Sequence, residues 1–306
     1  MLHRSEDNTL DALIPAHEKD HQLTVALSEL RLIKDEYEIT QMRKAVNATI
    51  RGFADVVKSL PEAMENPRGE RVIDGTFYRR ARIDGNELGY NTIAAAGAHA
   101  CVLHWIRNDG PALSGDLLLL DAGVEVESHY TADLTRTLPI NGKFTAAQRE
   151  IYQLVLAAQE AGIQAVKPGA KYRDINNACM RVLAEGLAKL GVLTVSAEES
   201  LDPNVGIHRR WSVHASGHML GIDVHDCAKA RGEQYLDGEL AVGHVLTVEP
   251  GLYIQPDDLL FPEEYRGVGV RIEDDILVTE SGAKILSNAL PRHPDEVEAY
   301  MAKLLK

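Results

Sequence analysis

Apolar side chains recur every three to four residues between positions 39 and 60, which is the spacing of one face of an α-helix. Proline follows at position 61, so the pattern predicts a long amphipathic helix that ends before Pro61. A second helix is expected over 70–83. The apolar positions of the long helix are Ile39, Met42, Val46, Ile50, Phe53, Val57 and Leu60.

Strand and helix patterns follow one another along the rest of the chain. Strands are expected at 90–96 and 101–106, followed by a hairpin over 116–139 that begins with an all-leucine run. Thr145 and Gln148 form a capping-box pattern that predicts a helix over 145–168, and a further helix over 173–191 ends at Gly191. Strands and turns are expected over 213–278, and a short helix over 293–306. This content predicts an α+β fold.

The first 27 residues are polar and show no periodicity. We therefore expect a remnant or linker segment over 1–27 and one folded domain over 28–306. The segment contains no apolar core of the kind found in signal peptides, and no stretch of the chain reaches the length of about 18 apolar residues that a membrane span requires.

A weak internal repeat marks two places in the chain. The segments "GDLLLLDAG" (115–123) and "GHVLTVEPG" (243–251) align without gaps at an offset of 128 positions. Each is followed by a second strand pattern that carries another acid and an arginine, "DLTRT" and "VRIEDD". The repeat predicts two similar αβ halves, each of which offers a pair of carboxylates to a site between the halves.

Alternation along the strands places these acids on one face. Asp121 shares a face with Leu117 and Leu119, as Glu249 does with Val245 and Thr247, because every second residue of a strand points to the same side. Arg271 and Glu273 share a face in the same way. Carboxylates at the end of an apolar strand repel one another and resist losing water, so a cation is expected between them.

The expected ligand set consists of four carboxylates and one imidazole from "SVHASGHMLGIDVHD". Oxygen ligands with one imidazole favour Mn²⁺ or Co²⁺, with Zn²⁺ as an alternative. Two divalent ions would neutralise the four negative charges, and two-metal sites of this kind activate water for attack on a carbonyl. The predicted metal ligands are Asp121, Asp133, His218, Glu249 and Glu273.

Each of these residues also has a structural explanation when it is considered alone. Asp121 and Glu249 precede glycine or Pro-Gly and would be ordinary turn acids, while Asp133 and Glu273 would be solvated strand residues and His218 a hydrogen-bonded loop histidine. Their joint occurrence in the repeat favours the metal site. His104, His214 and His225 are either packing residues or donors to an oxyanion. Six other histidines are expected at the surface: His3, His17, His21, His129, His208 and His293.

The composition restricts the class of protein. A net charge of −14, with no basic run longer than a pair, argues against nucleic acid and against an anionic membrane surface. The three cysteines are scattered and have no CxxC spacing, so a disulfide framework or a structural zinc site is disfavoured. A reducing cytoplasm is the expected compartment.

Four motifs resemble those of the Xaa-Pro aminopeptidase and prolidase family, which has the pita-bread fold. They are "DAGVEVESHYTADLTRTLPINGKFTAAQREIY", "GHMLGIDVHD", "VLTVEPGLY" and "YRGVGVRIEDDILVT", they stand in the family's order, and the resemblance covers about residues 28–306. It implies a pita-bread catalytic domain with two metal ions, usually Mn²⁺, that cleaves peptides before a proline at the second position. Oligomers are common in the family, so a homo-oligomer is expected.

The resemblance also implies a role for each matching residue. Asp121 chelates one ion, Asp133 and Glu273 bridge the ions, and His218 and Glu249 bind the second ion. Glu249 would also accept the proton of the attacking water, and His225 would stabilise the tetrahedral intermediate. The remaining matches, which line the pocket for the proline and its surroundings, are His104, His214, Tyr253 and Arg271.

Three departures from the family pattern are visible. The family commonly steps eleven positions between the first two metal aspartates, and Asp133 follows Asp121 by twelve, which predicts one extra residue in the hairpin loop. The segment between His214 and His218 reads "ASG", where relatives often have glycine, a variable residue and serine. About 30 residues precede the catalytic region, which is too few for the amino-terminal domain of larger relatives.

Several functions remain open at this point. An Xaa-Pro aminopeptidase is the first hypothesis and a prolidase limited to dipeptides is the nearest alternative, because both share the ligand set. A binding protein that has lost catalysis and a metal-free hydrolase resembling creatinase are further alternatives. The presence of every acid of the ligand set counts against both.

Overall fold

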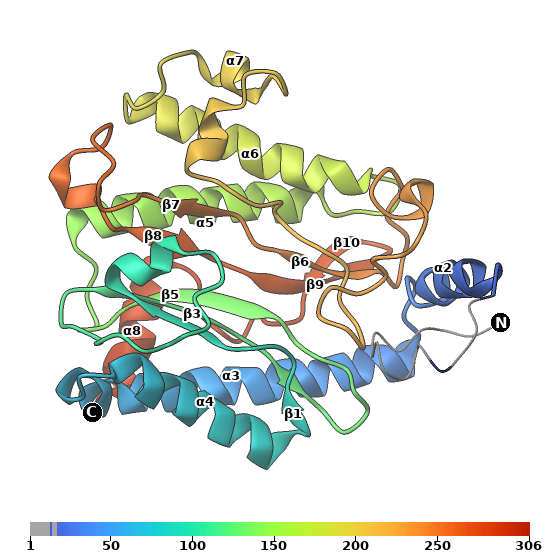
Figure 1. Cartoon of the computed structure of the whole chain (residues 1–306), viewed down its shortest axis with the longest axis horizontal. Coiled ribbons are helices and arrows are strands. Elements are labelled where there is room, and N and C mark those ends of the chain that lie inside the picture. Colours follow the sequence, from blue (N-terminus) through green and yellow to red (C-terminus); the bar gives the residue numbers. More distant parts are fainter. Residues whose placement is uncertain (1–12, 14–16) are drawn as a thin grey trace.

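The computed structural model describes residue 13 and residues 17–306, and Figure 1 shows the arrangement of the chain. The helices are α2 (Asp20–Leu30), α3 (Glu36–Glu65), α4 (Gly69–Asp84), α5 (Ala146–Ala165), α6 (Tyr172–Lys189), α7 (Ala197–Leu201) and α8 (Pro294–Leu304). The strands are β1 (Glu87–Leu88), β2 (Ile93–Ala96), β3 (Leu117–Ala122), β4 (Val124–Glu125), β5 (Leu134–Pro139), β6 (Val245–Val248), β7 (Gly251–Tyr253), β8 (Gly269–Arg271), β9 (Asp274–Thr279) and β10 (Gly282–Ile285).

Helix α3 begins at a capping box and continues past its proline. Asp35 accepts a hydrogen bond from the backbone of Glu38, whose side chain accepts one from the backbone of Asp35. The expected end before Pro61 is wrong, because the helix runs on to Glu65. Leu60 and Ala63 are both fully buried on either side of the proline, so packing of this face outweighs the hydrogen bond that proline cannot donate.

The predicted helices over 70–83, 145–168, 173–191 and 293–306 are confirmed as α4, α5, α6 and α8, with ends that differ by a few residues. The capping box of Thr145 and Gln148 is present at the start of α5. The predicted strand over 101–106 is wrong. A 3₁₀ helix, Gly97–Cys101, follows β2 instead, and the left-handed φ of 56° at Gly97 turns the chain out of the sheet.

Helix α2 begins at Asp20, within the segment 1–27 that the sequence predicts to be a remnant or linker and that shows no periodicity. Only Asp20 and Ser28 of this helix are buried, so there is no apolar face for the sequence pattern to reveal. Charged contacts hold the helix instead. Glu29 accepts a hydrogen bond of 2.6 Å from the Nε of Arg231, and Arg31 pairs with Asp226.

Two three-stranded antiparallel sheets form the centre of the molecule, in the orders β2-β3-β5 and β10-β9-β6. An isolated bridge between Thr135 and Glu273 joins the edge strand β5 to the start of β9. In Figure 1, α3 and α4 lie below the strands and α5 and α6 lie above them. Each sheet therefore has its own pair of helices, as the prediction of two αβ halves requires.

The structure confirms the sequence repeat in its backbone. Gly115 and Gly243, the first residues of the two repeat segments, have left-handed φ angles of 96° and 93°. The residue after each glycine accepts a backbone hydrogen bond of 2.9 Å through its carbonyl. Asp116 accepts from Ile140, and His244 accepts from Val278. Equivalent positions thus use the same turn to enter β3 and β6.

All three cysteines are free and buried. Among the residues that the structure describes, no helix is both long enough and apolar enough to cross a bilayer.

Candidate metal centre

The four predicted acids reach one cavity from the ends of neighbouring strands. Asp121 lies near the end of β3, Asp133 directly precedes β5, Glu249 directly follows β6 and Glu273 directly precedes β9. All four line a cavity of about 500 Å³ together with His218. The strand alternation that the sequence indicated therefore brings the predicted ligand set to one place.

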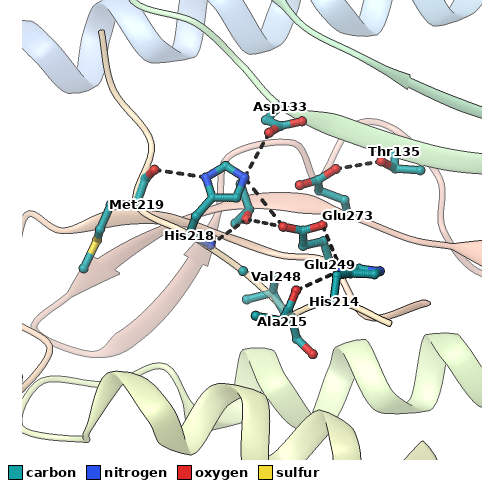
Figure 2. A network of polar contacts seen from close by, with 12 residues as sticks. Asp133, Thr135, His214, Ala215, His218, Met219, Val248, Glu249 and Glu273 are labelled. Atoms are coloured by element: carbon teal, nitrogen blue, oxygen red, sulfur yellow. Dashed lines mark hydrogen bonds and ion pairs between the residues drawn. The ribbon is translucent and has the colours of Figure 1, made fainter. Parts of the chain in front are cut away.

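Three of the predicted ligands form a tight cluster. The ligating atoms of Asp133, His218 and Glu273 all lie within 4.8 Å of one another. Figure 2 shows the ring of His218 between Asp133 and Glu249, with its Nε2 at 3.2 Å from Asp133 Oδ2 and 3.6 Å from Glu249 Oε1. The other ring nitrogen, Nδ1, donates to the carbonyl of Met219 at 3.0 Å. This bond leaves Nε2 as the nitrogen that would bind a metal.

The remaining aspartate is held by two partners. Asp121 Oδ2 accepts a hydrogen bond from Arg271, and Oδ1 accepts one of 2.6 Å from the hydroxyl of Tyr90. The same hydroxyl also contacts Asp133. A hydroxyl carries a single proton, so it cannot donate to both carboxylates at once. The hydroxyl oxygen of Tyr90 and one carboxylate oxygen each of Asp121 and Asp133 therefore lie close together with one proton among them. A bound cation would relieve the repulsion between the two carboxylates.

The pKa values of the clustered residues also favour a bound cation. Burial, reinforced by the charge of Asp133, raises the pKa of Glu273 well above its ordinary value and that of Glu249 to about 7. Burial also raises the pKa of Asp121. Burial alone would lower the pKa of His218, but the hydrogen bond to Asp133 and the charge of Glu249 raise it to about 9. The raised pKa values show that burial and the repulsion between the carboxylates favour their protonation. Divalent ions would neutralise their negative charge instead.

These observations fit divalent cations. The donors are carboxylate oxygens and one imidazole, the combination that suits Mn²⁺, Co²⁺ or Zn²⁺, and none of the three cysteines lines the cavity.

The "ASG" segment holds His218 beside β6. The backbone of Glu249 donates to the carbonyl of Ser216 at 3.0 Å, and that of Thr247 donates to the carbonyl of His218 at 2.8 Å. A side chain at Gly217 would lie 2.2 Å from the carbonyl oxygen of Thr247, so glycine is required at this position. The segment that departs from the family pattern is therefore also the place where the backbone of Gly217 packs closely against that of Thr247.

A hydrogen-bonded chain connects Arg271 to His214. Arg271 donates to the hydroxyl of Tyr253 at 2.8 Å, and this hydroxyl lies 2.7 Å from Nε2 of His214, whose Nδ1 donates to the carbonyl of Ala215. Burial and the charge of Arg271 lower the pKa of His214 to about 4. The imidazole is therefore neutral, and its contact of 3.6 Å with Glu249 in Figure 2 is not an ion pair.

The structure places the other predicted pocket residues in two positions. His104, His214, His225 and Arg271 line the cavity, whereas Tyr253 is buried behind it and contacts His214 and Arg271. The ring of His225 packs edge-on against His218, with centroids 4.5 Å apart. Within the described part of the chain, the ring nitrogens of His225 have no hydrogen-bond partner, so they are available to a substrate.

One histidine prediction is wrong. His208 is only 3% exposed, and its Nδ1 donates to the carbonyl of Ser200 at 2.7 Å. Of the other histidines predicted at the surface, His17, His21, His129 and His293 are exposed. His3 lies outside the described residues. Sequence reasoning also missed Tyr90, because its partners Asp121 and Asp133 lie 31 and 43 positions away.

Comparisons with known proteins agree with this geometry. The profile of metallopeptidase family M24 matches residues 40–280. Over 287 residues the chain is 61% identical to Xaa-Pro aminopeptidase 1 of Streptomyces coelicolor, covering 94% of this chain and 58% of that protein. It is 39% identical to Xaa-Pro aminopeptidase of Escherichia coli over 278 residues, covering 91% of this chain and 61% of that protein.

Solved structures agree with the sequence comparison. Zinc-substituted aminopeptidase P of Escherichia coli in complex with product superposes with a TM-score of 0.84 at 38% identity, covering 92% of this chain and 62% of that one. Aminopeptidase PepP of Pseudomonas aeruginosa gives a TM-score of 0.82 at 37% identity, covering 91% and 62%. These matches confirm the predicted pita-bread fold.

The chain spans about 60% of the length of these relatives. A profile match over most of the chain and two similar structural halves around one acidic cavity lead to the same conclusion. The chain belongs to metallopeptidase family M24.

Proposed function

We propose that residues 28–306 form the catalytic domain of a dimetal exopeptidase that hydrolyses the bond between an amino-terminal residue and a following proline. The observation that carries this proposal is the cavity of about 500 Å³ into which all five predicted metal ligands and three further histidines converge. The relatives named as Xaa-Pro aminopeptidases support the choice of substrate.

Two divalent ions, which we propose to be Mn²⁺ with Co²⁺ and Zn²⁺ as alternatives, would supply Lewis acidity and lower the pKa of water in the cavity. Their proposed ligands are Asp121, Asp133, His218, Glu249 and Glu273. Glu249 has a second task in this proposal, which is to accept the proton of the attacking water. Its position at the margin of the cluster, 3.6 Å from the Nε2 of His218, supports this role.

The oxyanion that forms at the attacked carbonyl requires donors. His225 is assigned this role because it lines the cavity and its ring nitrogens have no hydrogen-bond partner among the described residues. His214 is a second candidate, but its Nδ1 already donates to Ala215. Arg271 and Tyr253 would hold His214 in place through their hydrogen-bonded chain.

Proline at the second position fits the wall of the cavity. A tertiary amide has no N–H, so recognition must come from the shape of the ring rather than from a backbone hydrogen bond. Leu103, His104 and Ile106 provide apolar and aromatic surface on one wall. The free amine of the substrate is a cation, which the acidic cluster would attract.

A peptide assay tests this proposal. The Mn²⁺-loaded protein should release the first residue from Xaa-Pro-Yaa peptides and should leave Xaa-Ala-Yaa peptides intact. Hydrolysis of Xaa-Pro dipeptides alone would instead identify a prolidase. Absence of hydrolysis from both substrates, with metal bound, would leave a binding protein as the better description.

A further inference from the structure

The cavity wall formed by residues 97–110 has little regular structure of its own. After the 3₁₀ helix that ends at Cys101, the chain has no helix or strand until β3. Within residues 102–110 the backbone makes few hydrogen bonds to other backbone groups, such as the short-range one from Ile106 to the carbonyl of His104, and the carbonyl of Gly110 accepts one of 3.1 Å from the backbone of Glu70. The shape of this wall must therefore be fixed by groups outside it.

One buried carboxylate supplies four of those contacts, and the side chain of Asn108 adds two more, with Ala94 and Thr92. Glu70 lies in the first turn of α4 and is 0% exposed. Its Oε1 accepts hydrogen bonds of 2.8 Å from the backbone of Ala96 and of 2.8 Å from Nδ1 of His99. Its Oε2 accepts bonds of 2.9 Å from the indole of Trp105 and of 2.6 Å from the backbone of Gly110.

Glu70 depends on these four donors. Within the described residues it pairs with no lysine or arginine, and its partner of potential positive charge is His99. An isolated carboxylate is costly to bury, and charge-assisted hydrogen bonds offset that cost. All four donors come from residues 96–110, so the carboxylate and the cavity wall stabilise each other.

Two aromatic rings transmit this effect to the cavity. The rings of His99 and Trp105 stack with centroids 3.8 Å apart, and each donates to a different oxygen of Glu70. His104 directly precedes Trp105 and lines the cavity. Because the two residues share a peptide bond, a displacement of the backbone of Trp105 would also move the backbone from which His104 projects.

We propose that Glu70 is a positioning residue for the wall that receives the residue after the scissile bond, and that it acts on His104 through Trp105. The inference rests on the proposed function for its substrate class. It assigns to Glu70 no contact with substrate or metal, because Glu70 does not line the cavity.

The central variant is Glu70→Gln, which keeps the shape of the side chain but replaces one acceptor oxygen by a donor. Glu298→Gln is a matched control. Glu298 is also buried, at 8% exposure, and accepts from the backbone of Phe144 and from Lys143 and Arg149, away from the cavity. Both variants are expected to lower the melting temperature.

Kinetics on Xaa-Pro-Yaa peptides separate positioning from stability. Loss of about two hydrogen bonds at the wall should raise KM roughly tenfold for Glu70→Gln while kcat stays within about threefold. Trp105→Phe removes one donor and should raise KM by a smaller factor. Glu298→Gln should leave KM unchanged. An unchanged KM in Glu70→Gln would overturn the inference.

A second readout does not require turnover. Trp211 is only 1% exposed, so quenching of tryptophan emission by acrylamide reports mainly on Trp105. Glu70→Gln should make this emission more accessible to the quencher, and Glu298→Gln should not. If the wild-type protein fails to cleave Xaa-Pro peptides, the proposed function fails, while quenching still decides the role of Glu70. Equal quenching in wild type and Glu70→Gln would overturn it.

Discussion

Arg136 joins the two halves of the molecule directly behind the acidic cluster. Its guanidinium is fully buried and donates to the carbonyl of Glu273 at 2.6 Å and to a carboxylate oxygen of Asp274 at 2.7 Å. It also donates to the carbonyls of Leu290 and Pro291 at 2.9 and 2.8 Å. One side chain of β5 thus holds the start of β9 and the segment before α8.

We expect Arg136→Met to destabilise the protein without preventing folding. Removing one partner of a buried ion pair costs about 3–5 kcal/mol. Asp274 keeps hydrogen bonds from Ser287 at 2.5 Å and from Gln159 at 2.8 Å, and Arg292 lies 4.0 Å away, so the lower end applies. A loss of about 3 kcal/mol corresponds to a melting temperature lower by about 5 °C for a chain of this size.

Thermal unfolding followed by circular dichroism measures this effect, and Arg51→Met is the control. Arg51 pairs with Asp84 at 2.6 Å but is 53% exposed, so its loss should cost less than about 1 kcal/mol. If Arg136→Met melts within about 1 °C of the wild type, the buried pair contributes too little to hold the halves together and the reasoning is wrong.

Three further predictions concern charge and chemistry. Burial lowers the pKa of His244 to about 4, so its stabilising contribution is complete above the unfolded pKa of about 6.5 and is lost as the pH falls toward 4. His244→Asn should reduce the difference in stability between pH 7 and pH 4 by about 3 kcal/mol, measured by urea unfolding at both pH values. Asp226 directly follows His225 and pairs with Arg31, so we expect this ion pair to hold the backbone of His225 in position; Asp226→Asn should lower kcat about tenfold with little change in KM in steady-state assays, and an unchanged kcat would contradict this role. Glu249→Gln should abolish hydrolysis while its circular dichroism spectrum matches that of the wild type, and appreciable residual turnover would refute its assigned role.

Asp121 and Glu249 could be predicted because each stands at the end of a strand in a repeated segment, and Asp133 and Glu273 because each lies in the strand pattern that follows such a segment. Alternation and the repeat were sufficient to place Asp121 and Glu249 on one face, and both line the cavity. The shared left-handed turn at Gly115 and Gly243 has the same origin, since only glycine adopts that φ readily.

The supporting residues could not be predicted in this way. Glu70 has partners that lie 26 to 40 positions away, and Tyr90 contacts two acids from a loop that has no periodicity. Neither residue belongs to a repeat or to an apolar face, and their roles depend on tertiary contacts alone. The same reason explains the missed helix α2, which is held by charged contacts such as that between Glu29 and Arg231.

The central claim is that the acidic cluster binds a pair of divalent ions. Titration of the chelator-treated protein with Mn²⁺ in a calorimeter tests it most directly. Saturable binding of two ions per chain, reduced when Asp133 and Glu273 are both replaced by alanine, is the predicted result. Heats that show no saturable binding, or the same binding in the double variant, would contradict the account.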